Sequence, residues 1–177
     1  MTQQPTGILS SLVEYPLVRR IRRNHGLEHA TLNILATRFP KTPMAGYSTP
    51  KGFWIVGEVP TQSIVDAVQE AHRRLSAGEH NLAIHPNCGT NFIVAGAAAG
   101  LAGAFAMFSA RNRWRDRLER LPLAMSLATL ALIFAQPLGK LVQERVTTTG
   151  VLGELQVTEI TCTRKEQPVV HCILTRG

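Results

Sequence analysis

Two histidines and a glutamate stand close together in the stretch His25-Gly-Leu-Glu28-His29. On an α-helix, residues four apart lie on the same side, one turn apart, so both imidazoles could bind one metal ion. Glu28 lies beside them, and a carboxylate in that place can act as the general base of zinc-dependent hydrolysis. Histidines at this spacing also occur as ordinary surface residues, so the pattern gains weight only with a second group of ligands.

That second group lies at residues 85–91, which read His-Pro-Asn-Cys-Gly-Thr-Asn. His85 and Cys88 are three positions apart on a predicted tight turn, a spacing that suits one metal ion. Cys88 comes a few residues before a long apolar segment, which Thr90 or Asn91 could cap as a helix. The second group is therefore expected at a membrane surface.

Together the two groups predict a zinc site with four candidate ligands, His25, His29, His85 and Cys88. If both helix histidines and one of the other two bind, a fourth position stays open for water and Glu28 is the catalytic base. The protein is then a membrane-anchored, peptidase-like zinc-dependent hydrolase.

If all four ligands bind, the tetrahedral site is closed, as in structural zinc sites, and Glu28 only orients an imidazole. The protein is then a non-catalytic membrane protein whose metal serves assembly or partner binding. A carboxylate between two histidines is unnecessary for that role, which favours the hydrolase. A third alternative has no metal, with the histidines hydrogen-bonded in a polar core.

Two uncharged apolar segments, residues 92–110 and 121–139, must position this site. At about 1.5 Å rise per residue, each is long enough as a helix to cross most of a hydrocarbon core of roughly 30 Å. Pro122 suits the start of the second helix, and the Pro-Leu-Gly run that ends at Gly139 suits its end. The segments predict a transmembrane helical hairpin, with the buried hairpin of a soluble protein as the alternative.

Gly96 and Gly100 form a G-x-x-x-G pair in the first apolar segment. Such a pair lets another helix approach closely. That helix could be the other half of the hairpin or belong to a second copy of the chain in a homodimer.

The net charge of +7 lies largely in two arginine clusters, Arg19, Arg20, Arg22 and Arg23, and Arg111, Arg113, Arg115, Arg117 and Arg120. Both clusters suit an anionic lipid surface, and no nucleic-acid-binding motif accompanies them. The first cluster could instead be a solvated helix face. The expected partner is the lipid bilayer, with anionic lipids at the first cluster and no nucleic acid.

The side of the membrane follows from two opposed arguments. Five arginines against two acids in residues 111–120 favour a cytoplasmic loop. That topology would require residues 1–91 to be translocated, although the chain opens with no secretory signal. Basic residues also flank the other ends of the apolar segments. We therefore expect an integral protein of the bacterial cell membrane with its main domain in the cytoplasm.

Hydrophobic spacing outside the membrane segments predicts a helix over residues 25–37, capped by Asn24 or beginning earlier near Leu17. Apolar residues then alternate over residues 47–59 about a turn at residues 50–52, which predicts a β-hairpin.

An amphipathic stripe predicts the next helix, capped by Thr61 and closed by Gly78. Residues 81–85 are expected to form a short strand. Residues 154–163 and 169–175 are rich in Val, Ile and Thr, and they predict a second β-hairpin that could extend the sheet of the first.

Five other residues that could do chemistry lack a metal-binding spacing. His72, His80 and His171 are expected to face solvent. Cys162 and Cys172 are expected to be reduced and half-buried, because three cysteines are too few for a disulfide framework in 177 residues.

The predicted fold class is α+β, a small helix and β-hairpin domain with an inserted two-helix transmembrane hairpin. Residues 1–91 form the N-terminal metal-binding region, and residues 92–139 form the hairpin. Residues 140–177 form a C-terminal β-hairpin that packs on the N-terminal region.

The stretches NHGLEHAT at residues 24–31 and HPNCGTNF at residues 85–92 resemble the paired signature of uncharacterised bacterial membrane proteins that are YqhQ-like. The likeness is closer to a smaller relative, itself a domain of unknown function. Its pattern, H-G-x-E-H followed by H-P-x-C-G-T, corresponds here to the residues His25, Glu28, His29, His85 and Cys88. The resemblance implies metal binding and membrane residence, and it implies no particular reaction.

Overall fold

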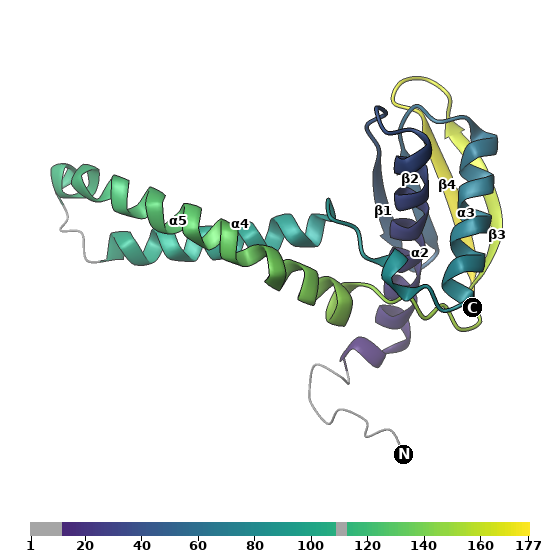
Figure 1. The fold of residues 1–177 in the computed structure, drawn as a ribbon, viewed down its shortest axis with the longest axis horizontal. Coiled ribbons are helices and arrows are strands. Elements are labelled where there is room, and N and C mark those ends of the chain that lie inside the picture. Colours follow the sequence, from purple (N-terminus) through teal and green to yellow (C-terminus); the bar gives the residue numbers. More distant parts are fainter. Residues whose placement is uncertain (1–11, 109–112) are drawn as a thin grey trace, which may run out of the picture. The chain divides into compact units, whose positions relative to one another are not determined.

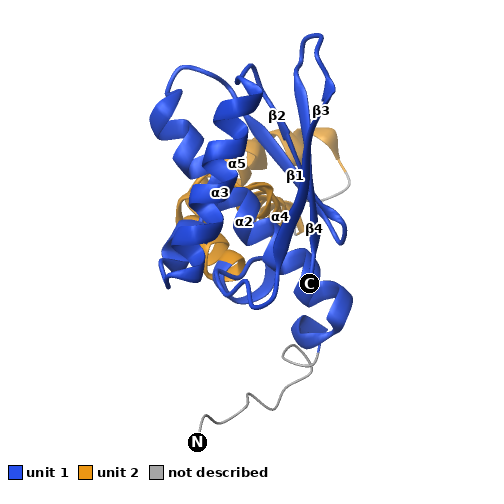
Figure 2. Ribbon diagram, turned by 90° about the vertical axis from the view of Figure 1, so that its right-hand side faces the viewer, with its two compact units in different colours: residues 1–85, 144–177 blue, residues 86–143 orange. Residues whose placement is uncertain are grey.

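The structure is a computed structural model that describes residues 12–108 and 113–177. It divides the chain into two compact units, residues 1–85 with 144–177, and residues 86–143 (Figure 2). The first unit combines helices with an antiparallel sheet, and the second contains two long apolar helices. The predicted α+β fold class is confirmed. Ala110 and Arg111, near the predicted helix junction, lie outside the described residues.

The sheet of the first unit has the strand order β1-β2-β4-β3. Its strands are β1 (Ala45–Thr49), β2 (Gly52–Val56), β3 (Gln156–Arg164) and β4 (Val170–Arg176). Every neighbouring pair is antiparallel. Both predicted hairpins are confirmed, and β4 pairs with β2, so the C-terminal hairpin extends the sheet that the first hairpin begins.

Helices α2 (Pro16–Arg38) and α3 (Thr61–Ser76) pack on one face of this sheet (Figure 1). The core contains fully buried side chains from both helices and from the central strands, namely Leu27, Leu35, Phe53, Ile55, Ile64, Val68 and Ile173. Phe53 and Ile55 alternate with the half-buried Trp54, as the two-residue period of a strand requires.

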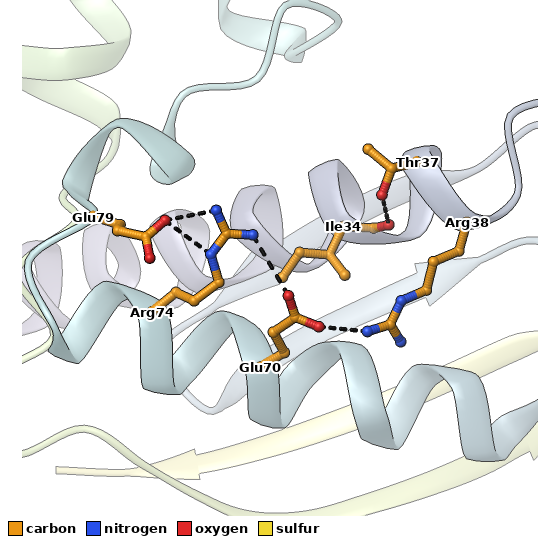
Figure 3. Close-up of polar contacts among 6 residues, drawn as sticks. All are labelled: Ile34, Thr37, Arg38, Glu70, Arg74 and Glu79. Carbon is orange, nitrogen blue, oxygen red and sulfur yellow. Dashed lines mark hydrogen bonds and ion pairs between the residues drawn. The ribbon is translucent and has the colours of Figure 1, made fainter.

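Charged side chains join the C-terminal end of α2 to α3 (Figure 3). Arg38 of α2 donates to Glu70 of α3. Arg74 contacts Glu70 at 3.5 Å and Glu79 at 2.6 Å. These side chains are partly exposed, so they fix the register of the two helices more than they stabilise the fold.

Asn24 does not cap a helix, because α2 begins at Pro16, close to the alternative start near Leu17. Proline suits a first helical turn, where no N–H donor is needed. The buried Asn24 amide donates to the Thr49 carbonyl, and its oxygen accepts from the Thr175 hydroxyl, both at 2.7 Å. This residue therefore ties α2 to β1 and β4.

The expectation that His171 faces solvent is wrong, because its side chain is fully buried in β4. Its Nε2 lies 3.0 Å from the Thr61 hydroxyl, so Thr61 contacts the histidine and does not cap α3, whose N-cap is Pro60. Burial lowers the pKa of His171 below its ordinary value. His72 and His80 each form a hydrogen bond with a backbone carbonyl.

The short strand expected at residues 81–85 is absent, and a 3₁₀ helix, η1 (His80–Ala83), is formed there. The Asn33 amide of α2 donates to the carbonyls of Leu82 and Ile84, at 2.9 and 3.0 Å. These carbonyls accept from a helix side chain and not from a neighbouring strand, so this segment does not form the expected strand.

The second unit is an antiparallel pair of helices, α4 (Gly89–Phe108) and α5 (Trp114–Val142). Both are long and apolar enough to cross a membrane, and only 6% of the most apolar window of each is buried. A core helix of a soluble protein would be mostly buried. The exposure of these helices therefore favours a lipid environment over a buried hairpin.

Pro122 and Pro137 lie inside α5, so their predicted places at its start and end are wrong. The helix is longer than its apolar segment because the Arg, Leu and Glu residues that precede it are good helix formers. The Ser126 hydroxyl donates to the Pro122 carbonyl at 2.8 Å, which satisfies a polar group in the apolar segment.

Polar contacts hold α4 and α5 together near both ends of the pair. The Gln143 amide donates to the Asn91 side-chain oxygen at 2.8 Å, beside Gly139. Near the other end, the Arg120 guanidinium donates to the Ala106 carbonyl at 3.2 Å.

The Gly96 and Gly100 pair does not serve this helix pairing. A Cβ atom built on either glycine meets no atom within 4 Å. The remaining use that the sequence suggested, close approach of a second copy of the chain, stays a prediction.

Candidate metal centre

His25 and His29 project from the same side of α2, with ring centroids 4.2 Å apart. Their spacing follows from the helix, in which positions i and i+4 are neighbours. His29 is 2% exposed, and His25 is half-buried.

Each of these rings is oriented by a backbone carbonyl. His25 Nδ1 lies 3.0 Å from the Thr147 oxygen, and His29 Nδ1 lies 2.8 Å from the Ala83 oxygen. A carbonyl can only accept, so Nδ1 must carry the hydrogen in both rings. Nε2 is then the ring atom left to bind a metal, which is the arrangement that metal-binding imidazoles commonly adopt.

Gly26 allows the segment that carries Thr147 to approach α2. A Cβ atom at Gly26 would lie 2.0 Å from the Thr149 carbonyl oxygen. The Thr149 N–H donates to the Arg22 carbonyl at 3.2 Å, and the Arg22 guanidinium donates to the Thr148 carbonyl at 3.1 Å. A glycine inside the H-x-x-E-H pattern thus has a steric reason.

Two members of the first arginine cluster bond to the backbone of their own unit. Besides Arg22, the Arg20 guanidinium donates to the Thr175 carbonyl at 2.8 Å. Arg19 is exposed. The binding of anionic lipid by this cluster stays a prediction.

His85 lies next to His29, with ring centroids 5.6 Å apart. Burial, with a smaller contribution from the charge of His29, lowers the pKa of His85 to about 4. The ring is therefore neutral at neutral pH, the form that can bind a metal.

His25, His29 and Cys88 form a group that could hold a metal ion. Cys88 is three residues beyond His85, so the chain itself keeps the thiol near the histidines. The Thr90 N–H donates to Cys88 Sγ at 3.4 Å. His85 adjoins this group without belonging to it.

Glu28 is 3% exposed and is directed at strand β1. The Ser48 hydroxyl donates to its carboxylate. A Cβ atom at Gly46 would lie 2.2 Å from Glu28 Oε1, so the glycine leaves room for the carboxylate. Burial raises the pKa of Glu28, and the Ser48 hydrogen bond and the charge of His25 oppose that rise.

The contacts that position the candidate site residues come from distant parts of the chain. Ser48, Thr147 and Ala83 carry no local signal in the sequence, because only the tertiary fold brings them to α2. Gly26 could have been singled out, since a glycine inside a helix often marks close approach of another backbone.

A family model described as "Domain of unknown function (DUF6391)" matches residues 20–160 of the chain. The chain belongs to this family. An uncharacterized protein of Picosynechococcus sp. is 40% identical over 158 residues, which are 82% of this chain and 75% of that protein. No solved structure matches the chain. Membership of an uncharacterised family is therefore confirmed, and the metal-dependent chemistry remains to be argued from the site.

Proposed function

We propose that this protein is a membrane-anchored, zinc-dependent hydrolase of peptide or other amide bonds. The observation that carries the proposal is the group of three ligands, His25, His29 and Cys88, with the Glu28 carboxylate on the same helix. Catalytic zinc sites keep three protein ligands and one open position, whereas structural sites have four.

The donor set fits zinc. Imidazole nitrogen and thiolate sulfur are the ligands that zinc prefers, and carbonyl bonds at Nδ1 fix the tautomer of both histidines. A zinc ion held there would supply Lewis-acid activation of a water molecule and of a substrate carbonyl.

Glu28 is the proposed general base, because it is the acidic residue beside the ligands. Burial raises the pKa of Glu28 above its ordinary value, the direction of shift that is common for carboxylates that act as general bases. Ser48 is a positioning residue that holds one carboxylate oxygen.

The position of the site along the chain supports membrane anchoring. Cys88 immediately precedes α4, and Thr147 ends the helical turn η2 (Gln143–Thr147) that continues α5. Both ends of the apolar helix pair are thus joined covalently to site residues. We propose that the main domain lies in the cytoplasm and that the partner of the protein is the lipid bilayer.

The second candidate is a structural metal site that serves assembly or partner binding. The contact between His85 and His29 favours it, because a small movement of His85 would supply a fourth ligand. An experiment on the fourth coordination position separates the two functions.

Cobalt-substituted protein in detergent, titrated with acetohydroxamate, provides that experiment. The hydrolase proposal predicts one bound cobalt per chain and a changed visible absorption spectrum when the hydroxamate occupies the open position. A spectrum that the hydroxamate leaves unchanged would support the closed structural site. Absence of stoichiometric metal from protein reconstituted with zinc or cobalt would reject both candidates.

A further inference from the structure

Strand β1 is an edge of the sheet, because β2 is its one strand neighbour in the described residues. Its sequence, Ala-Gly-Tyr-Ser-Thr, contains no charged residue and no proline. Ala45, Gly46 and Tyr47 are exposed. Proteins usually protect such edges with charges, prolines or bulges, since an open edge can pair with another chain.

The opposite edge, β3, has that protection. Its register with β4 is irregular at two places, between Val157 and Glu159 and between Cys162 and Arg164. It also carries charged residues. The register of β1 with β2 is regular over all five residues. The two edges of one sheet therefore differ in whether a further strand could be added.

The hydrogen-bond pattern shows which groups of β1 point outward. The Gly57 N–H donates to the Val169 carbonyl, and the Thr175 N–H donates to the Lys51 carbonyl. In an antiparallel ladder the bonding direction alternates, so odd-numbered residues of β2 bond toward β4 and even-numbered ones toward β1.

The pairing of β1 with β2 completes this assignment. Tyr47 lies opposite Trp54, an even-numbered residue, so the Tyr47 backbone bonds to β2. Gly46 and Ser48 lie opposite odd-numbered residues, and their backbone N–H and C=O groups are directed away from the sheet. These are also the residues that adjoin the Glu28 carboxylate.

We infer that the outer edge of β1 binds an extended polypeptide segment by strand addition, which makes unfolded or extended polypeptide the substrate class of the proposed hydrolase. The backbone groups of Gly46 and Ser48 would pair with the segment and hold it alongside Glu28. The inference rests on the proposed function for the reaction, although the docking itself can be measured without turnover.

Hydrogen–deuterium exchange with residue resolution tests the inference. Zinc-loaded Glu28→Gln protein in detergent is mixed with saturating casein, an unfolded polypeptide, so that binding is observed without cleavage. We expect exchange of the Gly46 and Ser48 amides to slow by tenfold or more. The amides of β3 provide the internal control and should not change.

Two results would overturn the inference. One is unchanged exchange at Gly46 and Ser48, and the other is equal slowing along β3, which would show non-specific binding. If cobalt binds and responds to acetohydroxamate but the β1 amides are unchanged, the docking fails and the hydrolase stands. If the β1 amides slow in protein that binds no metal, the hydrolase fails and the docking stands.

Discussion

Replacing Gly26 by alanine tests whether the close approach of residues 147–149 to α2 orients His25, a proposed metal ligand. The new Cβ would lie 2.0 Å from the Thr149 oxygen and 2.9 Å from its carbonyl carbon, although Cβ contacts below 3.0 Å essentially do not occur. The backbone segment must therefore retreat by about 1 Å, since a carbonyl cannot rotate away as a flexible side chain can.

The retreat would weaken two hydrogen bonds, His25 Nδ1 with the Thr147 carbonyl at 3.0 Å and the Thr149 N–H with the Arg22 carbonyl at 3.2 Å. Helix propensity alone favours alanine over glycine by about 1 kcal/mol. Overpacking costs roughly 1–3 kcal/mol, so we expect a net loss of stability. Loss of the carbonyl that orients a ligand should lower metal affinity by about 10–100-fold.

Metal affinity would be measured by competition with a chromophoric chelator, and stability by thermal unfolding of the metal-free protein in detergent. Gly100→Ala in α4 is the matched control, because a Cβ there meets no atom within 4 Å. The control should keep wild-type affinity. The reasoning is refuted if Gly26→Ala also binds metal within twofold of wild type, or if it melts at a higher temperature.

Three further predictions follow from particular side chains. Glu28→Gln should keep the metal and lower hydrolysis of casein by about 10²–10⁴-fold, and a variant that keeps full activity excludes Glu28 as the base. Burial lowers the pKa of His171 in the folded protein, so the free energy of unfolding should fall as the pH drops below about 6.5, the histidine pKa in the unfolded chain. The fall should be at most about 1.4 kcal/mol per pH unit. Thermal unfolding measured against pH should show a smaller fall for His171→Gln. Gly100→Ile should reduce cross-linked dimer in detergent, and an unchanged yield would remove the glycine pair from the dimer.

The elements that the sequence predicted are those whose signal is local. The alternation about Phe53 and Ile55 and the apolar stripe of α3 depend on neighbours within a few residues, and both appear in the structure. The prolines of α5 were misplaced because helix formers on either side override a local breaker. The burial of His171 was missed because its environment is made by α3, far away in the chain.

The candidate site also has one part that the sequence predicts and another part that depends on contacts between distant residues. The i, i+4 spacing placed His25 and His29 together correctly, since a helix fixes it. The partners of these rings and of Glu28 could not be predicted, because they come from β1, η1 and the segment after α5. Cys88 was predicted as a candidate ligand from its three-residue spacing from His85, which the chain itself fixes.

X-ray absorption spectroscopy of the zinc-loaded protein tests the central claim most directly, because it counts the ligands around the metal. The account predicts one sulfur at about 2.3 Å and three nitrogen or oxygen atoms at about 2.0–2.1 Å, with the sulfur lost in Cys88→Ser and kept in Cys162→Ser. A zinc ion without a sulfur ligand, or a sulfur that persists in Cys88→Ser, would contradict it.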